Sequence, residues 1–266
     1  MSAHPACRIP AECPAKMRMS FLKTRGIVIK EVGVGEADKI VTLFTGNRGR
    51  ISAMAKGGKR PKSNLSAGSQ LMCYGEYVLY CGKEMYMVNS CEVLEPFYDI
   101  RNDMVKLTYA AHFLDIVMEI VQENQPAPKL LQLLLNSLFM LTKPEKSPEL
   151  TARIFELRAL AISGYAPHAQ NCMICGREPE KFYSFSFLKC GFICDREQCA
   201  AEDRFAPELS PGAARTIQHI LFSRMEGLFH FGVSNEVLEE LGRLSKRYLR
   251  EQLEKDFTKL EFLKSI

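Results

Sequence analysis

Apolar and polar residues alternate in short runs along the first third of the chain, between Lys23 and Pro96. Five of these runs are rich in Val, Ile, Tyr and Thr, which is typical of β-strands. The predicted strands cover residues 26–30, 38–45, 49–55, 70–81 and 85–94. The turn signals that separate them are Gly33 and Gly35, Gly46 with Asn47, Gly57 with Gly58, and Gly82.

Five short strands with a long basic loop between the third and the fourth favour a small closed barrel of the OB type. We assign this barrel to residues 23–97. A five-stranded SH3-like barrel fits the same pattern of strands and turns.

The apolar period changes after Pro96. Apolar residues recur at every third or fourth position from Met104 to Val121, which is typical of an amphipathic helix. Further helices are predicted over residues 130–141, over 148–162, from Pro211, and after a cap at Ser234. We therefore predict an α+β multidomain protein, in which an α-helical domain over residues 98–266 follows the barrel and carries a Cys-rich insert at about 167–207.

The first residues of the chain show neither period. Residues 1–22 contain Pro5, Pro10 and Pro14, and we predict a disordered N-terminal extension there. The apolar core of a secretory signal is absent from this stretch. No run reaches the roughly 18 apolar residues of a membrane helix. We therefore expect a cytoplasmic protein.

Positive charge is concentrated in the predicted barrel. The net charge of the chain is +4, but the segment from Thr24 to Lys62 alone holds nine basic and three acidic residues. Four of these cations lie in KGGKRPKS, residues 56–63, which we call the basic loop. Its glycines let the backbone approach a polyanion, and its cations would release counterions when phosphates replace them. A solvated loop that serves only solubility is the alternative.

Aromatic side chains of the predicted barrel could stack on nucleobases, as they do in barrels that bind single strands. The candidates are Phe44, Tyr74, Tyr77, Tyr80 and Tyr86. A place in the barrel core explains most of them equally well, and it is the interpretation that we prefer.

Five of the ten cysteines cluster in the insert. Cys172-x2-Cys175 and Cys194-x4-Cys199 flank a β-rich connector, and two such pairs supply four thiolates to a tetrahedral Zn²⁺. Four thiolates leave no open coordination position, so we predict one structural zinc ion per chain rather than a catalytic one. The other candidate ligands are Cys190 and His168.

No catalytic set emerges from the sequence. A phosphate-binding G-x-x-x-x-G-K-[ST] loop is absent, and the segment GVGEAD that starts at Gly33 lacks the third glycine of a dinucleotide fingerprint. The five histidines form no H-E-x-x-H motif. His112 falls within a predicted helix, where packing explains it better than catalysis. We therefore predict that the chain is not an enzyme.

Several segments together carry a family resemblance. They are KTRGIVIKEVGVGEADKIVTLFTGNRGRISAMAKGGKRPKS, CEVLEPF, FELRALAISGYAP, CMICG and FSFLKCGFIC. In this order they resemble bacterial RecO, the recombination mediator, and the first is similar to its N-terminal OB-fold. The resemblance covers the chain from about Lys23 onward, and GEADKIVTLFT with KGGKRPKS is its most specific part.

The resemblance implies a mediator of DNA repair and homologous recombination. RecO proteins bind single- and double-stranded DNA and anneal complementary strands. With RecR and RecF they help RecA load onto DNA coated by single-strand-binding protein, which implies association with the nucleoid. The DNA-binding residues that the resemblance implies are Arg25, Lys39, Arg48, Arg50, Lys56, Lys59, Arg60 and Lys62.

The insert departs from the family pattern. Many members have C-x2-C … C-x2-C, whereas the second pair here is spaced x4, and Cys190 stands where a glycine usually precedes Gly191. The zinc ligands implied are Cys172, Cys175, Cys194 and Cys199, with Cys190 in reserve. The alternative function is a zinc-stabilised protein-interaction adaptor with no direct role on DNA.

Overall fold

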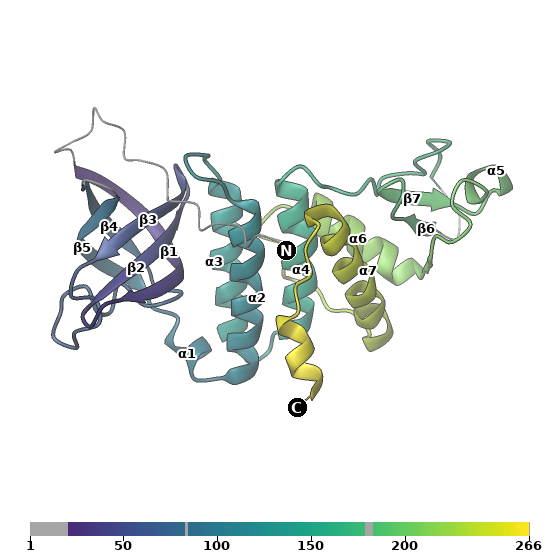
Figure 1. Ribbon diagram of the computed structural model, residues 1–266. Helices are drawn as coiled ribbons and strands as arrows, with labels where there is room; N and C mark the ends of the chain where they lie inside the picture. The colour runs from purple at the N-terminus through teal and green to yellow at the C-terminus, as the bar shows by residue number, and fades with distance from the viewer. Residues whose placement is uncertain (1–20, 83–84, 179–182, 266) are drawn as a thin grey trace, which may run out of the picture. The chain divides into compact units, whose positions relative to one another are not determined.

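The computed structural model describes residues 21–82, 85–178 and 183–265 (Figure 1). The chain divides into two compact units. The barrel unit comprises the residues up to Tyr98 together with Val117–Leu131, and the helical unit comprises Asp99–Ile116 together with Gln132–Ile266. The predicted disorder of residues 1–22 lies outside the described residues, except that strand β1 already begins at Phe21.

Five strands close into a barrel in the order β1-β2-β3-β5-β4. They are β1 (Phe21–Val34), β2 (Asp38–Thr45), β3 (Gly49–Ala55), β4 (Tyr74–Cys81) and β5 (Tyr86–Glu95). Strands β3 and β5 pair in parallel, and the other neighbours are antiparallel. This arrangement confirms the predicted OB-type barrel and sets the SH3-like alternative aside.

Strand β1 is long because it pairs with its two neighbours along different halves of its length. Its first half pairs with β4 and its second half with β2, and both pairings meet at Gly26. A Cβ at Gly26 would lie 2.9 Å from the carbonyl oxygen of Phe44, so this crossing needs a glycine. The turn predicted at Gly33 is wrong, because Gly33 pairs with Lys39 inside the β1–β2 ladder.

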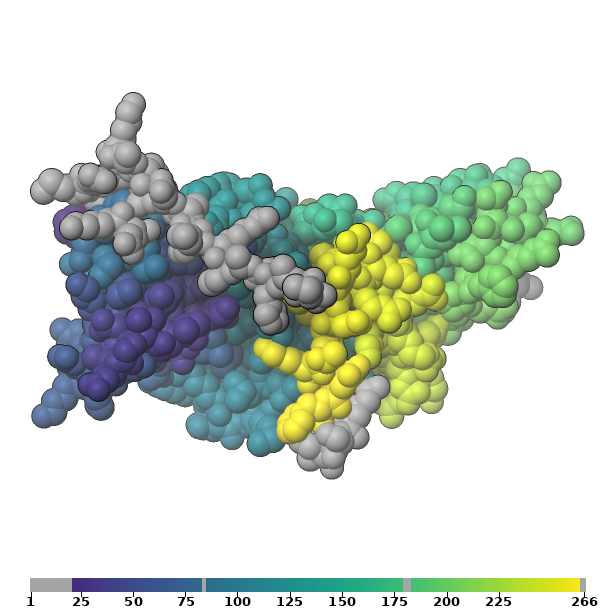
Figure 2. All heavy atoms as spheres, viewed as in Figure 1, coloured from purple at the N-terminus to yellow at the C-terminus, as the bar shows by residue number. Residues whose placement is uncertain are grey.

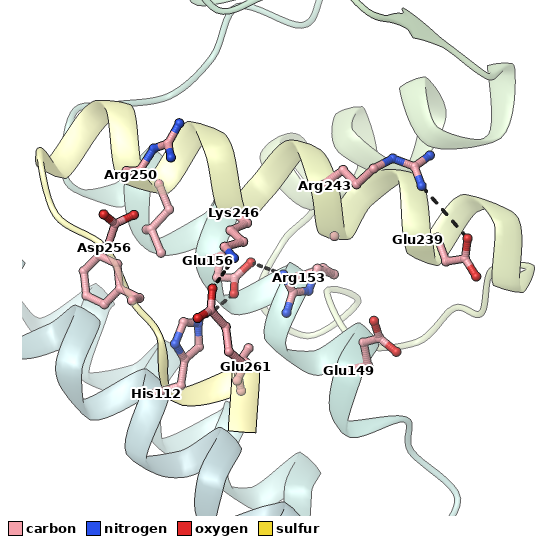
Figure 3. Close-up of a pocket in the computed structure, with 14 residues that line it drawn as sticks. His112, Glu149, Arg153, Glu156, Glu239, Arg243, Lys246, Arg250, Asp256 and Glu261 are labelled. Atoms are coloured by element: carbon pink, nitrogen blue, oxygen red, sulfur yellow. Dashed lines mark hydrogen bonds and ion pairs between the residues drawn. The ribbon is translucent and has the colours of Figure 1, made fainter. Parts of the chain in front are cut away.

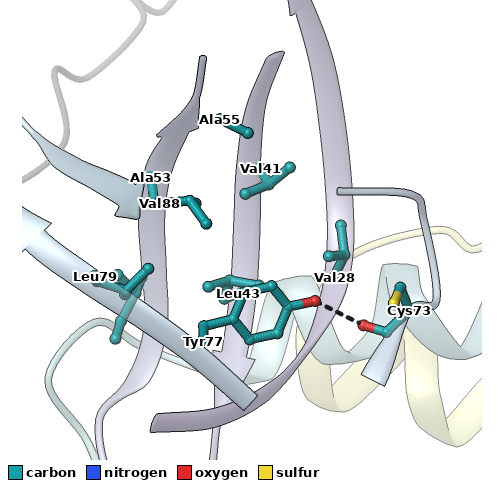
Figure 4. Packing of buried hydrophobic residues seen from close by; sticks show 10 residues of the cluster. Val28, Val41, Leu43, Ala53, Ala55, Cys73, Tyr77, Leu79 and Val88 are labelled. Atoms are coloured by element: carbon teal, nitrogen blue, oxygen red, sulfur yellow. Dashed lines mark hydrogen bonds between the residues drawn. The ribbon is translucent and has the colours of Figure 1, made fainter. Parts of the chain in front are cut away.

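The barrel core follows the predicted alternation. Along β3, buried and half-buried residues alternate without a break. Side chains from all five strands meet inside, and Figure 4 shows Val28, Val41, Leu43, Ala53, Ala55, Leu79 and Val88 around Tyr77. The Tyr77 hydroxyl donates to the carbonyl oxygen of Gly68 (2.8 Å), so the buried polar tip of this ring is satisfied.

The helical unit is built around one nearly buried helix. The α-helices of the described ranges are α1 (Tyr98–Arg101), α2 (Met104–Ile120), α3 (Pro128–Thr142), α4 (Pro148–Ile162), α5 (Glu197–Ala200), α6 (Pro211–Phe222) and α7 (Asn235–Leu253), of which the end of α2 and the start of α3 belong to the barrel unit. Helix α4 packs against α6 and α7, and its Phe155 stacks on Phe113 of α2 with 4.5 Å between ring centroids. The chain ends in a 3₁₀ helix, Lys259–Ser265, and Figure 2 shows this C-terminal segment in yellow at the surface.

Serine caps fix where three of these helices begin. The side chains of Ser147, Ser210 and Ser234 each accept a backbone N–H from the first turn of α4, α6 and α7. Pro148 and Pro211 occupy the first helical turn, where a missing N–H costs nothing. The predicted starts of these helices are therefore confirmed. No helix in the described ranges is both long and apolar enough to cross a membrane.

The Cys-rich insert forms a small sheet in the order β7-β6-β8. Its strands are β6 (Tyr183–Ser186), β7 (Gly191–Cys194) and β8 (Glu208–Leu209). The insert packs on α7, because Phe185 meets Tyr248 edge to face (5.4 Å) and the Arg247 guanidinium lies 3.9 Å from the ring centroid of Phe187. Aromatic packing thus attaches the insert to the body of the helical unit.

Candidate nucleic-acid interface and metal centre

The basic loop is a compact series of turns that begins directly after β3. The N–H of Gly58 donates to Ala55 O (3.1 Å), and that of Arg60 donates to Gly57 O (2.9 Å). The N–H of Ser63 then donates to Arg60 O (3.0 Å). Gly57 has φ +69°, a conformation that side-chain-bearing residues rarely adopt. Backbone hydrogen bonds therefore form successive turns along the loop.

Three cations project from this loop into solvent. Lys56, Arg60 and Lys62 are exposed, and within the described ranges none of them forms an ion pair. Three uncompensated charges within seven residues produce a concentrated positive potential, which attracts polyanions. These side chains are the strongest candidates for contact with phosphates.

Lys59, unlike the other three cations of the basic loop, donates hydrogen bonds to the turn between β1 and β2. Its Nζ donates to Gly35 O (2.7 Å), and its backbone N–H donates to Ala37 O (2.9 Å). A Cβ at Gly33 would lie 2.6 Å from Lys59 Cε, so the stem of the lysine crosses a strand position that has no side chain. Lys59 thus ties the basic loop to the turn between β1 and β2.

Two other predicted DNA-binding cations lie beside acids. Arg25 Nε is 3.4 Å from Glu76 Oε2, and Lys39 Nζ is 3.0 Å from Glu31 Oε2. The side chain of Lys39 is only 17% exposed. The carboxylate of Glu76 also pairs with Lys23, and these cations lower its pKa below the ordinary value. Arg25 and Lys39 therefore offer phosphates less charge than the basic loop does.

Arg48 and Arg50 lie at the β2–β3 turn and are half-buried. The Arg50 guanidinium donates to the carbonyl oxygen of Met118 (2.8 Å) in the last turn of α2, and its backbone N–H donates to Gln122 O (3.2 Å). Arg50 thus caps a helix C-terminus, where a cation is favourable. The Arg50 side chain therefore contacts the end of α2 within the barrel unit.

The structure places the candidate stacking residues on two different sides of the barrel wall. Phe44 and Tyr77 are buried, and Tyr74 and Tyr86 are half-buried. Tyr80 lies outside, next to Phe21, with the two rings edge to face at 6.3 Å. Phe21 is 67% exposed and was missed from the sequence, because it falls within the stretch predicted to be disordered.

The insert brings the four predicted metal ligands together. The sulfur atoms of Cys172, Cys175, Cys194 and Cys199 all lie within 4.8 Å of one another. Cys172, Cys194 and Cys199 are buried. Burial alone raises the pKa of Cys172, but backbone N–H groups of Cys175, Cys194 and Ile174 point at its sulfur and bring the pKa to about 6.

The remaining thiols of this cluster are crowded. Burial and the neighbouring sulfurs raise the pKa of Cys199, because several thiolates at this spacing repel one another. A bound cation would relieve that repulsion, so the donor set fits a metal ion. The cluster could therefore hold a metal through its four sulfurs.

The two reserve ligands lie elsewhere. Cys190 and His168 are not part of the four-sulfur group found in the described residues. Cys190 has φ +54°, and its sulfur accepts from Gln252 Nε2 (3.5 Å) on α7. The left-handed backbone explains why glycine suits this position. His168 Nε2 contacts Asn171 Oδ1 at 2.5 Å.

A polar cavity of about 570 Å³ lies in the helical unit, between α4, α7 and the C-terminal segment (Figure 3). At its floor Glu156 contacts His112 Nε2 (2.7 Å) and Arg153 (3.0 Å). Burial raises the pKa of Glu156, but the charge of Arg153 and hydrogen bonds from His112 and Ser245 outweigh burial and hold it below the ordinary value.

The lining of this cavity is balanced in charge. It carries four Lys or Arg and five Asp or Glu side chains, and several pair with one another, as Lys246 does with Glu261 at 2.5 Å. No Ser, Thr or Cys lines it. The cavity therefore presents no excess of positive charge to an anion and no hydroxyl or thiol beside His112, which is buried.

Comparison with known proteins agrees with both units. The family model for the N-terminal part of recombination protein O matches residues 19–97, and that for its C-terminal part matches residues 101–261. The DNA repair protein RecO of Acetivibrio thermocellus is 55% identical over 248 residues, which is 93% of this chain and 98% of the relative. The RecO proteins of Alkaliphilus metalliredigens and Caldicellulosiruptor saccharolyticus are each 34% identical and are covered over their full length, with 92% and 93% of this chain aligned. A closed five-stranded barrel, a helical unit and a four-cysteine cluster thus occur in a chain that belongs to the RecO family of DNA repair proteins.

Proposed function

We propose that this chain is a recombination mediator that binds single- and double-stranded DNA and anneals complementary strands. With RecR and RecF as partners, it would help RecA load onto DNA coated by single-strand-binding protein, which would place it at the nucleoid. The observation that carries the proposal is the basic loop, where Lys56, Arg60 and Lys62 are exposed and unpaired within the described ranges. Membership of the RecO family supports the same function.

In this proposal the eight predicted residues divide by role. Lys56, Arg60 and Lys62 contact phosphates, because their charges are not used inside the protein. Arg25, Lys39 and Arg48 flank that contact. Lys59 and Arg50 support it, since both donate to backbone carbonyl oxygens of the barrel unit. Such contacts bind by charge and shape and do not read base sequence.

We further propose that the metal is a structural zinc ion. Four sulfurs at a Zn–S distance of about 2.3 Å form a tetrahedron with edges of about 3.8 Å. Cys175 Sγ and Cys194 Sγ lie 3.7 Å apart. Zinc bound by Cys172, Cys175, Cys194 and Cys199 would join the CMIC turn, strand β7 and helix α5 in the insert.

Fluorescence anisotropy with a labelled oligonucleotide, measured over a range of salt concentrations, tests the DNA contact. The logarithm of affinity falls linearly with that of salt, with a slope of about −0.7 for each phosphate neutralised on a single strand. The triple variant Lys56→Ala, Arg60→Ala, Lys62→Ala should weaken binding and flatten the slope by about two.

A matched control removes the same charge elsewhere. Arg204, Arg215 and Arg224 are exposed in the helical unit, and their triple Ala variant should leave the slope unchanged. Equal effects of the two triple variants would assign the binding to net charge rather than to the loop. Strand annealing on oligonucleotides coated with single-strand-binding protein, with and without the loop cations, then tests the mediator activity.

A further inference from the structure

An acidic side chain holds the basic loop in place. Asp38 is the first residue of β2 and pairs with Val34 across the β1–β2 turn. Its Oδ1 accepts the backbone N–H of Gly57 at 2.7 Å, in a half-buried position. The bond joins the start of one strand to a loop 19 residues further along the chain. Asp38 belongs to the GVGEAD segment, to which the proposed function gives no role.

The position of this carboxylate is unfavourable for a simple phosphate-binding surface. A negative charge next to the backbone that carries Lys56 and Arg60 repels a polyanion. If attraction alone shaped this surface, a neutral residue would serve better at position 38. The hydrogen bond to Gly57 indicates instead that the carboxylate holds the loop backbone.

The loop needs an anchor at this point. Gly57 and Gly58 lie between Lys56 and the other cations, and glycine loses more conformational freedom on ordering than any other residue. A loop that is mobile in the free protein must be ordered when it binds, and affinity falls accordingly. The Asp38–Gly57 bond and the two contacts of Lys59 with residues 35 and 37 all tie the loop to the turn between β1 and β2.

We propose that Asp38 is a positioning residue for DNA binding, which fixes the basic loop through the Gly57 N–H in the shape that presents its cations to phosphates. Asp38 touches no phosphate itself. The proposal rests on the proposed function of the basic loop and adds a residue whose charge has the wrong sign for direct contact.

Charge and positioning predict opposite results for Asp38→Ala. Loss of a nearby negative charge alone would tighten oligonucleotide binding, by up to about threefold. Loss of a hydrogen bond to a charged acceptor frees the loop and should weaken binding about tenfold. Asp38→Asn removes the charge but keeps an oxygen acceptor, so its affinity should stay within about threefold of the unaltered chain or exceed it. The salt slope should remain unchanged in both variants, because every cation is still present.

Glu36 provides the matched control. It lies two residues earlier in the same turn, is exposed, and makes no hydrogen bond or ion pair within the described ranges. Glu36→Ala removes the same charge and should bind as tightly as the unaltered chain or slightly more tightly. Hydrogen exchange of the basic loop, followed by mass spectrometry, should rise in Asp38→Ala and stay unchanged in Asp38→Asn and Glu36→Ala.

The outcomes separate the two proposals. If the unaltered chain binds and Asp38→Ala binds equally well or better, the positioning role is refuted while the loop contact stands. Unchanged hydrogen exchange of the loop in Asp38→Ala refutes the positioning role as well. If the unaltered chain does not bind oligonucleotide at low salt, the proposed function is refuted, and the role of Asp38 with it. Weaker binding by Asp38→Ala, with rescue by Asp38→Asn and an unchanged slope, supports the proposal.

Discussion

Replacing Glu156 with glutamine measures how much the buried charge network stabilises the helical unit. The carboxylate of Glu156 contacts His112 at 2.7 Å and Arg153 at 3.0 Å, and its side chain is only 2% exposed. The substitution keeps the size of the side chain and removes its charge. Arg153, whose side chain is 8% exposed, is then left as a buried cation with a hydrogen bond to the Ser245 hydroxyl.

The expected loss is large because water cannot replace the missing partner. Removing one member of a buried ion pair lowers the free energy of unfolding by about 3–5 kcal/mol. The Ser245 hydrogen bond and the retained amide oxygen offset part of this, so we expect about 3 kcal/mol. In a unit of roughly 150 residues each kcal/mol shifts Tm by about 2–4 °C. The helical unit of Glu156→Gln should therefore melt about 10 °C lower.

Calorimetry and urea unfolding followed by circular dichroism at helical wavelengths would measure this loss. A chain with two compact units can unfold in two transitions, so the transition that carries the helical signal is the relevant one. The double variant Arg153→Met, Glu156→Leu removes both charges and should recover most of the stability. A loss below about 1 kcal/mol for Glu156→Gln, or a double variant as unstable as the single one, would refute the charge argument.

The same carboxylate predicts a response to acid. The pKa of Glu156 is raised by burial but lowered further by the charge of Arg153 and by hydrogen bonds from His112 and Ser245, so in the folded state it lies below its ordinary value of 4.5. A carboxyl with a depressed folded pKa stabilises the fold above its unfolded pKa, and this contribution is lost as pH falls through the folded pKa. As the pH falls below 4.5, the free energy of unfolding of the unaltered chain should therefore fall more steeply than that of Glu156→Gln.

Two further pairs of variants test the barrel and the insert. Gly49 has φ +61°, and a Cβ there would overlap the carbonyl oxygen of Gln122. Gly49→Ala should therefore lower the free energy of unfolding, measured in urea, by about 3 kcal/mol or more. Gly35 has φ +54° with open space around it, so Gly35→Ala should lower the free energy of unfolding by only about 1 kcal/mol. Cys194→Ser should lower the zinc content measured by elemental analysis well below one ion per chain, whereas Cys190→Ser should leave it unchanged; equal zinc loss in both would reassign the ligands.

Much of the fold could be predicted because local rules and packing agree. The alternation along Gly49–Ala55 predicts a strand with one face inside, and the structure has that strand. Ser210-Pro211 and Ser234 predict helix starts because a capping side chain acts only on its own first turn. The sequence predicts a turn at Gly33 because glycine usually interrupts strands. Gly33 lies inside β1 because it pairs with Lys39 across the β1–β2 ladder, and the residues around Gly33 alone do not reveal that partner.

The candidate sites were predictable to different degrees. The four-cysteine cluster could be found because tetrahedral coordination favours short spacings within each cysteine pair, and such spacings can be read from the chain. The sequence could not show that Cys190 lies outside this cluster, because that depends on a hairpin that turns its sulfur toward Gln252. The sequence does not reveal Phe21, because the strand-like pattern of apolar residues begins only at Gly26, whereas β1 begins at Phe21.

The cations show why charge in the sequence differs from charge at the surface. Nine basic residues lie between Thr24 and Lys62, but a nearby acid offsets the charge of a basic side chain, and a hydrogen bond to a carbonyl oxygen of the fold holds the side chain in place. Arg25 and Lys39 lie beside carboxylates, and Arg50 and Lys59 donate to backbone oxygens. The proposed contact with phosphates should therefore depend on the acids beside the cations as well as on the cations themselves. Glu76 lies within ion-pair distance of both Lys23 and Arg25, so a neutral residue at this position would leave both cations without that partner.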